Sequence, residues 1–522
     1  TGLDADGGEI ILGSGITNAG SMTLDGAVLD ASALDGEAGT IYLRMARNVV
    51  TDADGLSMND AVLAAGKVIV EGVATYQDAR ITSSDTTAWK NDARTFMNTH
   101  ESAVETRLRN ESTGSDDAIT LIPGIEVQSE GDLRIDTGLT LTNWRFGAQS
   151  VPANISFKAA GNLYVNKSFF DYPTSYQDPY SAYLDVETAQ QSTGYSFTAG
   201  ASTSSAGGFT SSDPFAVSRG IGDLVFGDDV VVYTEGGDIN FASGNHTEIG
   251  KVNPRSTDHM NLPNSFGGND MKYNLGAYAG NIRGKAGGDL VVKGVIQTAV
   301  GDINLDVAGS VRMIRNSSDS MGTIRTIGSP MTVSDWMASE YNWYGEDFGL
   351  FLETDRRAAT HEYYQGGNID IRAGGNIQVQ MLSGTTDEMF FLNLDAWDDQ
   401  TKLSQWIPST DEFIRYEYWA ASYGGRDGVS EVRPAATQGI ATMGGGNIDL
   451  DAGGSVFGQM GTFGQGDFSV SAQGNINGWF LSHDGELRLT SMTNIGNISD
   501  DQAIQAFDSR IKLSAQGDTT LA

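Results

Sequence analysis

Paired glycines set eight residues apart, each opening a short alternating strand, constrain this chain more than any other feature. The clearest example is Gly444–Phe457, where Gly-Gly-Gly-Asn-Ile-Asp-Leu-Asp-Ala-Gly-Gly-Ser-Val-Phe contains two such strands. The pattern recurs at 366–379, 301–313 and 466–478. The glycine pairs are Gly446/Gly454, Gly367/Gly375, Gly301/Gly309 and Gly466/Gly474. The spacing from one glycine pair to the next is longer than the eight residues within a pair. The two spacings together give a full period of about twenty residues, a length typical of a solenoid coil.

Apolar and polar residues alternate within each repeat, as Ile369 and Ile371 do with their neighbours. A period of two places one set of side chains inward and the other outward. A single coil buries few aliphatic side chains, so it needs neighbouring coils above and below it. A hairpin meander would not hold the eight-residue spacing so regularly, and we predict a parallel β-helix. Its core should contain Ile369, Ile371, Ile377, Val379, Ile448, Leu450 and Val456.

The turns of each coil should depend on two residue types. Glycine permits a positive φ where the coil bends sharply. Asn376, Asn447 and Asn475 each follow such a glycine. Asparagine tolerates the left-handed conformation and can bond to the backbone of the next coil.

Composition narrows the range of partners. The chain has 67 Asp and Glu against 32 Lys and Arg, a net charge of −35, which argues against nucleic acid and anionic membrane as partners. The 66 glycines suit many turns between many strands, and the absence of cysteine excludes disulfides and thiolate metal sites. No apolar run is long enough to span a membrane, so we expect no membrane insertion. Both ends read as repeat sequence, and we expect a segment of a longer polypeptide.

The repeats resemble those of the filamentous haemagglutinin family, large exoproteins secreted by the two-partner route. A second likeness is the succession 121–135 (Leu-Ile-Pro-Gly-Ile-Glu-Val to Leu-Arg-Ile), 143–147 (Asn-Trp-Arg-Phe-Gly) and 155–165, which is similar to a C-terminal segment of such proteins. The likeness covers most of the repeats and none of the long insertions. It implies a right-handed parallel β-helix, an outer-membrane transporter as partner during export, an extracellular location on the bacterial cell surface and a role in adhesion.

The chain alternates between regular coils and insertions, and the fold class expected is all-β with one inserted helix. We predict coils over 1–73, a helical insertion over 74–120 and coils over 121–313 with surface loops at 169–220 and 243–285. Coils with two long aromatic-rich insertions, 314–365 and 381–443, follow. Regular coils over 444–522 should continue beyond the segment.

Residues 85–109 predict an amphipathic helix. Trp89, Phe96, Val104 and Leu108, together with the alanines at 93 and 103, fall on one stripe, and Asp85 suits an N-cap. We expect this stripe to pack on the flank of the β-helix, the alternative being a helix that binds a partner.

The polar residues give few signs of catalysis or metal binding. Same-face sets such as Asp449 and Asp451, Asp370 and Arg372, or Asp302, Asn304 and Asp306 could line a groove, but the outer solvated face of a strand explains them too. The five histidines are scattered, without the spacing of metal ligands. The paired aspartates (Asp228-Asp229, Asp398-Asp399, Asp500-Asp501) leave calcium open, yet match no calcium loop. We therefore predict no catalytic, cofactor or metal site.

Aromatic residues of the two late insertions are the best candidates for a contact surface, since Trp and Tyr on loops suit carbohydrate stacking and protein interfaces. The alternative is a satellite core that anchors the loops. The candidates are Trp336, Trp343, Tyr344, Trp397, Trp406, Tyr418 and Trp419.

These observations together favour a non-catalytic structural or adhesive segment, a stiff rod that presents its insertions to a receptor on a host cell, a neighbouring cell or a glycan. Two alternatives stay open. One is a subunit of a homopolymeric filament, with other copies of the chain as partners. The other is a β-helical polysaccharide-active enzyme.

Overall fold

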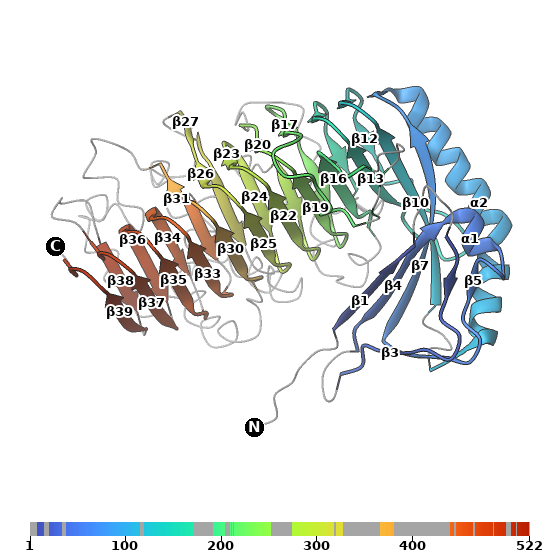
Figure 1. The fold of residues 1–522 in the computed structure, drawn as a ribbon, viewed down its shortest axis with the longest axis horizontal. Helices are drawn as coiled ribbons and strands as arrows, with labels where there is room; N and C mark the ends of the chain where they lie inside the picture. The colour runs from blue at the N-terminus through green and yellow to red at the C-terminus, as the bar shows by residue number, and fades with distance from the viewer. Residues whose placement is uncertain are drawn as a thin grey trace, which may run out of the picture. The chain divides into compact units, whose positions relative to one another are not determined.

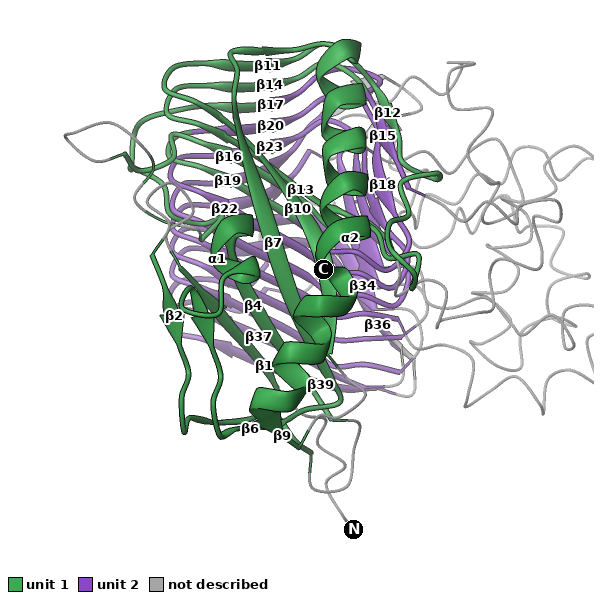
Figure 2. Ribbon diagram, turned by 90° about the vertical axis from the view of Figure 1, so that its right-hand side faces the viewer, with its two compact units in different colours: residues 1–167, 191–224, 240–245 green, residues 168–190, 225–239, 246–522 purple. Residues whose placement is uncertain are grey.

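A computed structural model of the protein shows strands, two helices and the turns that join them in the residues it describes (Figure 1). The described residues are 8–14, 20–33, 38–114, 119–171, 192–203, 209, 211, 213–251, 274–317, 320–326, 366–380, 439–442, 445–462, 465–483, 485–496, 503–507 and 509–520. They fall into two compact units (Figure 2). Unit 1 comprises Thr1–Lys167, Gln191–Leu224 and Asn240–Asn245, and unit 2 comprises Ser168–Gln190, Val225–Ile239 and His246–Ala522. Two strands, β17 (Leu224–Phe226) and β19 (Ile239–Ser243), contain residues of both units.

Unit 2 is built from parallel strands that form three sheets. The first sheet contains β22 (Ile282–Ala286), β25 (Ile303–Val307), β30 (Ile369–Ala373), β33 (Ile448–Ala452), β35 (Phe468–Ala472), β37 (Glu486–Ser491) and β39 (Arg510–Ala515). The second contains β20 (Thr247–Ile249), β23 (Leu290–Val292), β26 (Val311–Met313), β31 (Ile377–Val379) and β34 (Val456–Thr462). The third contains β15 (Phe169–Phe170), β18 (Val232–Thr234), β21 (Leu275–Ala277), β24 (Val295–Thr298), β29 (Thr323–Thr326), β32 (Gly439–Thr442), β36 (Ile476–His483) and β38 (Ala503–Phe507). From β34 onward one strand serves both the second and third sheets, since β34 pairs with β31 and with β32.

Each coil pairs in register with the next, which confirms the predicted all-β fold of stacked parallel coils. Ile369 of β30 lies opposite Ile303 on one side and Ile448 on the other, and Ile448 in turn lies opposite Phe468. The seven residues predicted to point into the core are all buried, none more than 3% exposed. Among the paired strands of unit 2, the antiparallel pair is the small hairpin of β27 (Arg315–Ser317) and β28 (Ser320–Met321).

The turn glycines are required mainly by close stacking. Of the eight paired glycines, Gly446 alone has a left-handed backbone, with φ +99°. A Cβ atom on Gly367 would overlap the carbonyl oxygen of Gly301 one coil earlier, and a Cβ on Gly466 would overlap that of Gly446. The prediction that these glycines serve positive φ was therefore wrong for most of them: the coils approach too closely at this corner for any side chain.

Two ladders of polar side chains join successive coils at the corners beside the glycines. In each rung, a side chain accepts a hydrogen bond from the backbone N–H of the equivalent residue one coil later, as Asn368 does from Asn447 at 2.9 Å. The first ladder comprises Asp238, Asn281, Asp302, Asn368, Asn447, Asp467 and Glu486. The second comprises His246, Asp289, Ser310, Asn376, Ser455, Asn475, Asn494 and Asp518.

The ladders confirm half of what the sequence predicted for Asn376, Asn447 and Asn475. These side chains do bond to the backbone of the next coil. None of the three has a positive φ, so the expected left-handed conformation was wrong. Asp and Ser fill the same positions because a rung requires only a short side chain that accepts a hydrogen bond.

Replacing Asn447 by Ala should weaken one rung and leave its neighbours intact. The Asp467 amide would lose its acceptor, while the Asn447 amide would still donate to Asn368. A single hydrogen bond contributes about 1 kcal/mol, so exchange of the Asp467 amide should accelerate roughly fivefold. Asn447→Asp keeps an acceptor and serves as the control. Equal acceleration at both amides would contradict this account.

Strands of all three sheets lie inside segments that the sequence assigned to loops. β29 falls within 314–365, β32 within 381–443, and β20, β21 and the start of β22 within 243–285. Two of them, β29 (Thr-Ile-Arg-Thr) and β32 (Gly-Ile-Ala-Thr), show no alternation, because they are buried along their whole length. Such a short strand of small and polar residues offers no periodic signal.

A row of buried hydroxyl side chains ends the third-sheet strands of successive coils. Its members are Thr298, Thr326, Thr442, Thr462 and Ser482, which lie opposite one another and are fully buried. Thr326 Oγ1 donates to the carbonyl of Gly367 at 2.8 Å, and Thr442 Oγ1 donates to that of Gly446 at 3.1 Å. Each bond ties the end of one strand to the turn that opens the next coil.

Unit 1 has the same parallel construction. Its main sheet contains β1 (Glu9–Gly13), β4 (Thr40–Ala46), β7 (Lys67–Gln77), β10 (Ile119–Ser129), β13 (Asn154–Ala159) and β16 (Tyr195–Ala199). Shorter strands are β2 (Met22–Thr23), β3 (Val28–Asp30), β5 (Leu56–Ser57), β6 (Ala61–Ala64), β8 (Arg80–Ile81), β9 (Ser112–Thr113), β11 (Leu133–Ile135), β12 (Leu139–Thr140) and β14 (Leu163–Val165). The predicted surface loop 169–220 was wrong in part, since β16 is a buried strand that pairs with β13.

Helix α2 (Ser83–Glu111) interrupts the coils between β7 and β10, and a short helix, α1 (Arg47–Thr51), precedes it (Figure 2). Helix α2 packs on β10, in line with the prediction that it lies on the flank of the coils. Phe96 lies against Gly72, and Trp89 lies 5.7 Å from Tyr76 between ring centroids. Two details of the prediction were wrong. Thr82, and not Asp85, is the N-cap. Asp85 occupies the third helical position, where its carboxylate accepts the backbone N–H of Thr82 at 2.8 Å. Ala103, which was placed on the apolar stripe, faces solvent.

Candidate functional site

The aromatic residues predicted as a contact surface lie outside the described part of the chain. All seven belong to 327–365 or 381–438. What the structure does describe is where each of these segments leaves the solenoid and where it returns. The first runs from the end of β29 to the turn before β30, and the second from the turn after β31 to β32.

The same-face carboxylates predicted along the strands lie on the outer face of the first sheet. Asp370 lies opposite Asp449, and Arg372 lies opposite Asp451, on adjacent strands. Asp449 and Asp451 are exposed, as the solvated-face interpretation expected. Desolvation by neighbouring groups, together with the charges of Asp370 and Asp451, still raises the pKa of Asp449. Asp302 does not share this role, because it accepts the N–H of Asn368 in the first ladder.

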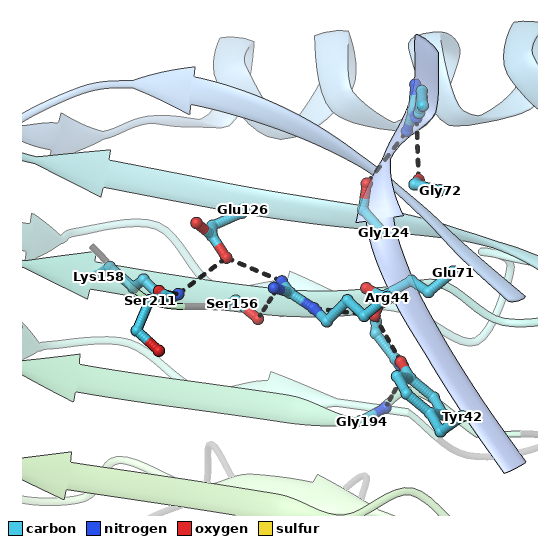
Figure 3. A network of polar contacts seen from close by, with 12 residues as sticks. Tyr42, Arg44, Glu71, Gly72, Gly124, Glu126, Ser156, Lys158, Gly194 and Ser211 are labelled. Atoms are coloured by element: carbon cyan, nitrogen blue, oxygen red, sulfur yellow. Dashed lines mark hydrogen bonds and ion pairs between the residues drawn. The ribbon is translucent and has the colours of Figure 1, made fainter. Parts of the chain in front are cut away.

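A buried network of charged side chains crosses the outer face of the main sheet in unit 1 (Figure 3). Arg44 on β4 binds Glu71 on β7 at 3.0 Å and Glu126 on β10 at 2.8 Å. Lys158 on β13 lies 3.3 Å from the same Glu126 oxygen. The Glu71, Glu126 and Lys158 side chains are no more than 2% exposed. The network therefore joins four successive strands by ion pairs removed from water.

Neutral groups complete the network. Tyr42 donates to Glu71 at 2.5 Å and accepts from Asn154 Nδ2 at 2.6 Å. Gln128 donates to Glu126 at 2.6 Å. Lys158 Nζ donates to the carbonyl of Ser211 at 2.9 Å, so part of the segment that follows β16 covers the network. Arg44 Nη1 and Glu71 Oε1 are buried there without a hydrogen-bond partner.

Burial and neighbouring charges shift the pKa of four members of the network. Burial opposes ionisation of Glu126, but Arg44 and Lys158 lower the pKa of this carboxyl below its ordinary value. Burial likewise opposes the charge of Arg44, and the carboxylates of Glu71 and Glu126 raise its pKa. Burial lowers the pKa of Lys158, and the attraction of Glu126 opposes this shift. Burial and the charge of Glu71 raise the pKa of Tyr42. Two cations balance two carboxylates, which suits a tie between strands.

A second pair of buried carboxylates fastens helix α2 to β10 and to the turn before β13. Glu101 accepts the N–H of Ala148 at 2.7 Å, and Glu105 accepts the N–H of Leu121 at 3.0 Å. Gln149 Nε2 also donates to Glu105, at 3.1 Å, and Arg109 pairs with it at 3.2 Å. Burial raises the pKa of Glu105. These carboxylates accept backbone N–H groups and act as an anchor for the helix.

The structure gives no metal centre among the residues it describes, where three or more His, Asp and Glu nowhere gather as a ligand set. Of the paired aspartates, Asp228 accepts the Lys251 N–H and lies 3.4 Å from its ammonium group, and Asp229 has a φ of +61° in the same turn. The other two pairs lie outside the described ranges. No described helix combines the length and the apolar character that crossing a bilayer requires.

Sequence reasoning missed both buried networks because their members are far apart in the chain. Tyr42 and Asn154 are 112 residues apart, and Arg44 is 82 residues from Glu126. No local spacing reveals such a set. One signal was available: Glu71, Glu126 and Lys158 each occupy a polar position within an apolar strand, where a charge needs a partner.

No protein-family model matches this chain, and no curated protein and no solved structure matches it either.

Proposed function

We propose that this chain is a non-catalytic structural and adhesive segment of a large secreted bacterial surface protein of the filamentous haemagglutinin type. In this proposal the coils form a right-handed parallel β-helix, and the two long insertions carry the contact with a receptor on another cell or on a glycan. The coils repeat one surface many times, whereas 327–365 and 381–438 differ from each other and concentrate the tryptophans.

One observation carries the proposal: the register of the coils is unbroken across both insertions. The rung from Asp467 to Asn447 spans 20 residues in a regular coil. The corresponding rung from Asn368 to Asp302 spans 66 residues, and that from Asn447 to Asn368 spans 79. Ile303, Ile369 and Ile448 nevertheless lie opposite one another as consecutive core residues. A scaffold that accepts such insertions without a change of pairing is suited to presenting them.

The Thr326 bond closes the first insertion at its base. Thr326 Oγ1 donates to Gly367 O at 2.8 Å across the whole of 327–365, in the way that Thr442 bonds to Gly446 across a short turn. The stacked coil beneath the insertion is therefore complete without it.

Removing the insertions tests the proposal directly. In one variant, residues 327–365 are replaced by the dipeptide Phe-Gly. This is the dipeptide, Phe463-Gly464, that joins Thr462 to Gln465 in a regular coil. In a second variant, residues 380–438 are deleted, so that Val379 is joined directly to Gly439. In the next coil the equivalent residues are Gly458 and Gln459. Because Gly458 has a φ of +115°, the variant also carries Val379→Gly. Both should keep the circular dichroism of the full chain and lose binding to epithelial cells and to a glycan array.

Truncating Trp406 and Trp419 to Ala in the full chain separates contact from packing. If these rings bind a receptor, binding should fall by about 2 kcal/mol or more per ring while the chain keeps its resistance to protease. If they form a satellite core, protease should cut 381–438 while binding stays unchanged.

The other outcomes point to the alternatives. If the full chain forms end-to-end polymers in sedimentation and electron microscopy and the deletion variants do not, the filament subunit would be favoured. Release of reducing sugar from polysaccharide by the full chain would favour the enzyme. Unchanged adhesion in both deletion variants would remove the insertions from the proposal.

A further inference from the structure

One rung of the second ladder differs chemically from the others. Asp289, Ser310, Asn376, Ser455, Asn475 and Asn494 all accept through oxygen. In the first rung, the backbone N–H of Asp289 donates to Nδ1 of His246 at 2.8 Å. This rung joins the coil of β20 to the coil of β23, whose strands pair from Thr247 opposite Leu290 to Ile249 opposite Val292.

The accepting atom determines how a rung responds to acid. An imidazole can accept at Nδ1 only when it is neutral and carries its single proton on Nε2. Protonation places a hydrogen on Nδ1, which then faces the donor N–H of Asp289, and the bond is lost. Serine and asparagine remain acceptors at every pH at which the protein is folded, and a carboxyl group keeps an acceptor oxygen even when it is protonated. Histidine is the side chain whose ordinary titration falls between pH 5 and 8.

We propose that His246 makes this rung an acid-sensitive link, closed at neutral pH and open when the imidazole is protonated. His246 is exposed, so protons reach it without any movement of the coil. The response is confined to one corner between two coils, because the next rung, from Ser310 to the carboxylate of Asp289, depends on no imidazole.

The charged groups around the imidazole do not restore the rung. Asp289 Oδ1 accepts the Ser310 N–H, and its Oδ2 pairs with Arg312. On β20, Glu248 pairs with Lys293 at 2.5 Å. Asp223 accepts a hydrogen bond from Asn245, the residue before His246. An imidazolium ion attracted to a carboxylate would still offer no acceptor to the Asp289 N–H.

Hydrogen exchange of single amides at pH 7.5 and pH 5.0, in the full chain and corrected for the intrinsic pH dependence of exchange, tests the link. The Asn475 amide, which donates to Ser455 Oγ at 3.0 Å, is the internal reference because its acceptor does not titrate. Protection of the Asp289 amide relative to this reference should fall about fivefold on acidification, the effect of one lost hydrogen bond.

Two variants make the test specific. His246→Asn supplies the acceptor found elsewhere in the ladder and should keep the Asp289 amide protected equally at both pH values. Asn376→His moves the device to another rung, so the Ser455 amide, which donates to Asn376 at 2.7 Å, should become acid-sensitive. Equal protection of Asp289 at both pH values in the natural chain, or the same loss in His246→Asn, would overturn the proposal.

Discussion

Replacing Ile448 by Asp is expected to open the middle of unit 2 and to leave unit 1 folded. Ile448 is 1% exposed and lies between Ile369 and Phe468 of the adjoining coils. A carboxylate in its place would lie in an apolar core without a partner, at a cost of about 4 kcal/mol or more unless the coil opens to admit water.

The pattern of damage distinguishes a solenoid from a globular core. Because each coil contacts only its neighbours, amide exchange should accelerate in β30, β33 and β35 and stay unchanged in β4 and β7. Asp451→Asn, an exposed position on the same strand, serves as the control and should leave exchange in all these strands unchanged. Uniform acceleration through both units would show that the chain unfolds as one cooperative body.

Replacing Glu126 by Gln should destabilise the buried network of unit 1 by about 3 kcal/mol, because it leaves the charges of Arg44 and Lys158 facing a single buried carboxylate. Glutamine keeps the volume of the side chain, so the loss reports on charge. Amides of β10 and β13 should then exchange roughly a hundredfold faster. Glu248→Gln is the matched control: Glu248 pairs with Lys293 at the surface, and its loss should cost less than about 1 kcal/mol.

Acid should weaken the same network. The pKa of Glu126 is lower in the folded protein than in the unfolded chain, so its contribution is fully present above about pH 4.5 and is lost as the pH falls through the folded value. In Glu126→Gln this part of the acid dependence should disappear. Adding Lys158→Met to Glu126→Gln removes the excess positive charge and should restore part of the stability. A Glu126→Gln variant no less stable than Glu248→Gln would show that the ion pairs contribute nothing.

The parts of the fold that could be predicted are those that depend on residues close together in the sequence. Ile369 and Ile371 alternate with polar residues between two glycines, and this pattern alone predicts a strand with one buried face. β29 and β32 were not predicted as strands, because they are buried along their whole length and their residues do not alternate between apolar and polar. Their small and polar residues are also typical of loops. Thr82 was missed as the N-cap of α2 because Asp85, three residues later, has the same preference for a helix start.

The candidate site could be predicted far less well. The carboxylates of Asp449 and Asp451 were placed on the outer face because strand periodicity decides which face a residue occupies. The network of Arg44, Glu126 and Lys158 depends instead on which strands become neighbours, and that is decided by pairing across many residues. The role of the tryptophans of the insertions stays a prediction, since they lie outside the residues that the structure describes.

The Thr326–Gly367 bond makes this corner a natural place to graft a foreign peptide. The entropy of closing a flexible loop rises only with the logarithm of its length, so a graft twice as long as another costs about 0.6 kcal/mol more. Its two ends are held by contacts of the scaffold and not by the graft. The length and composition of what is displayed can thus change by small steps without any compensating change in the coils below.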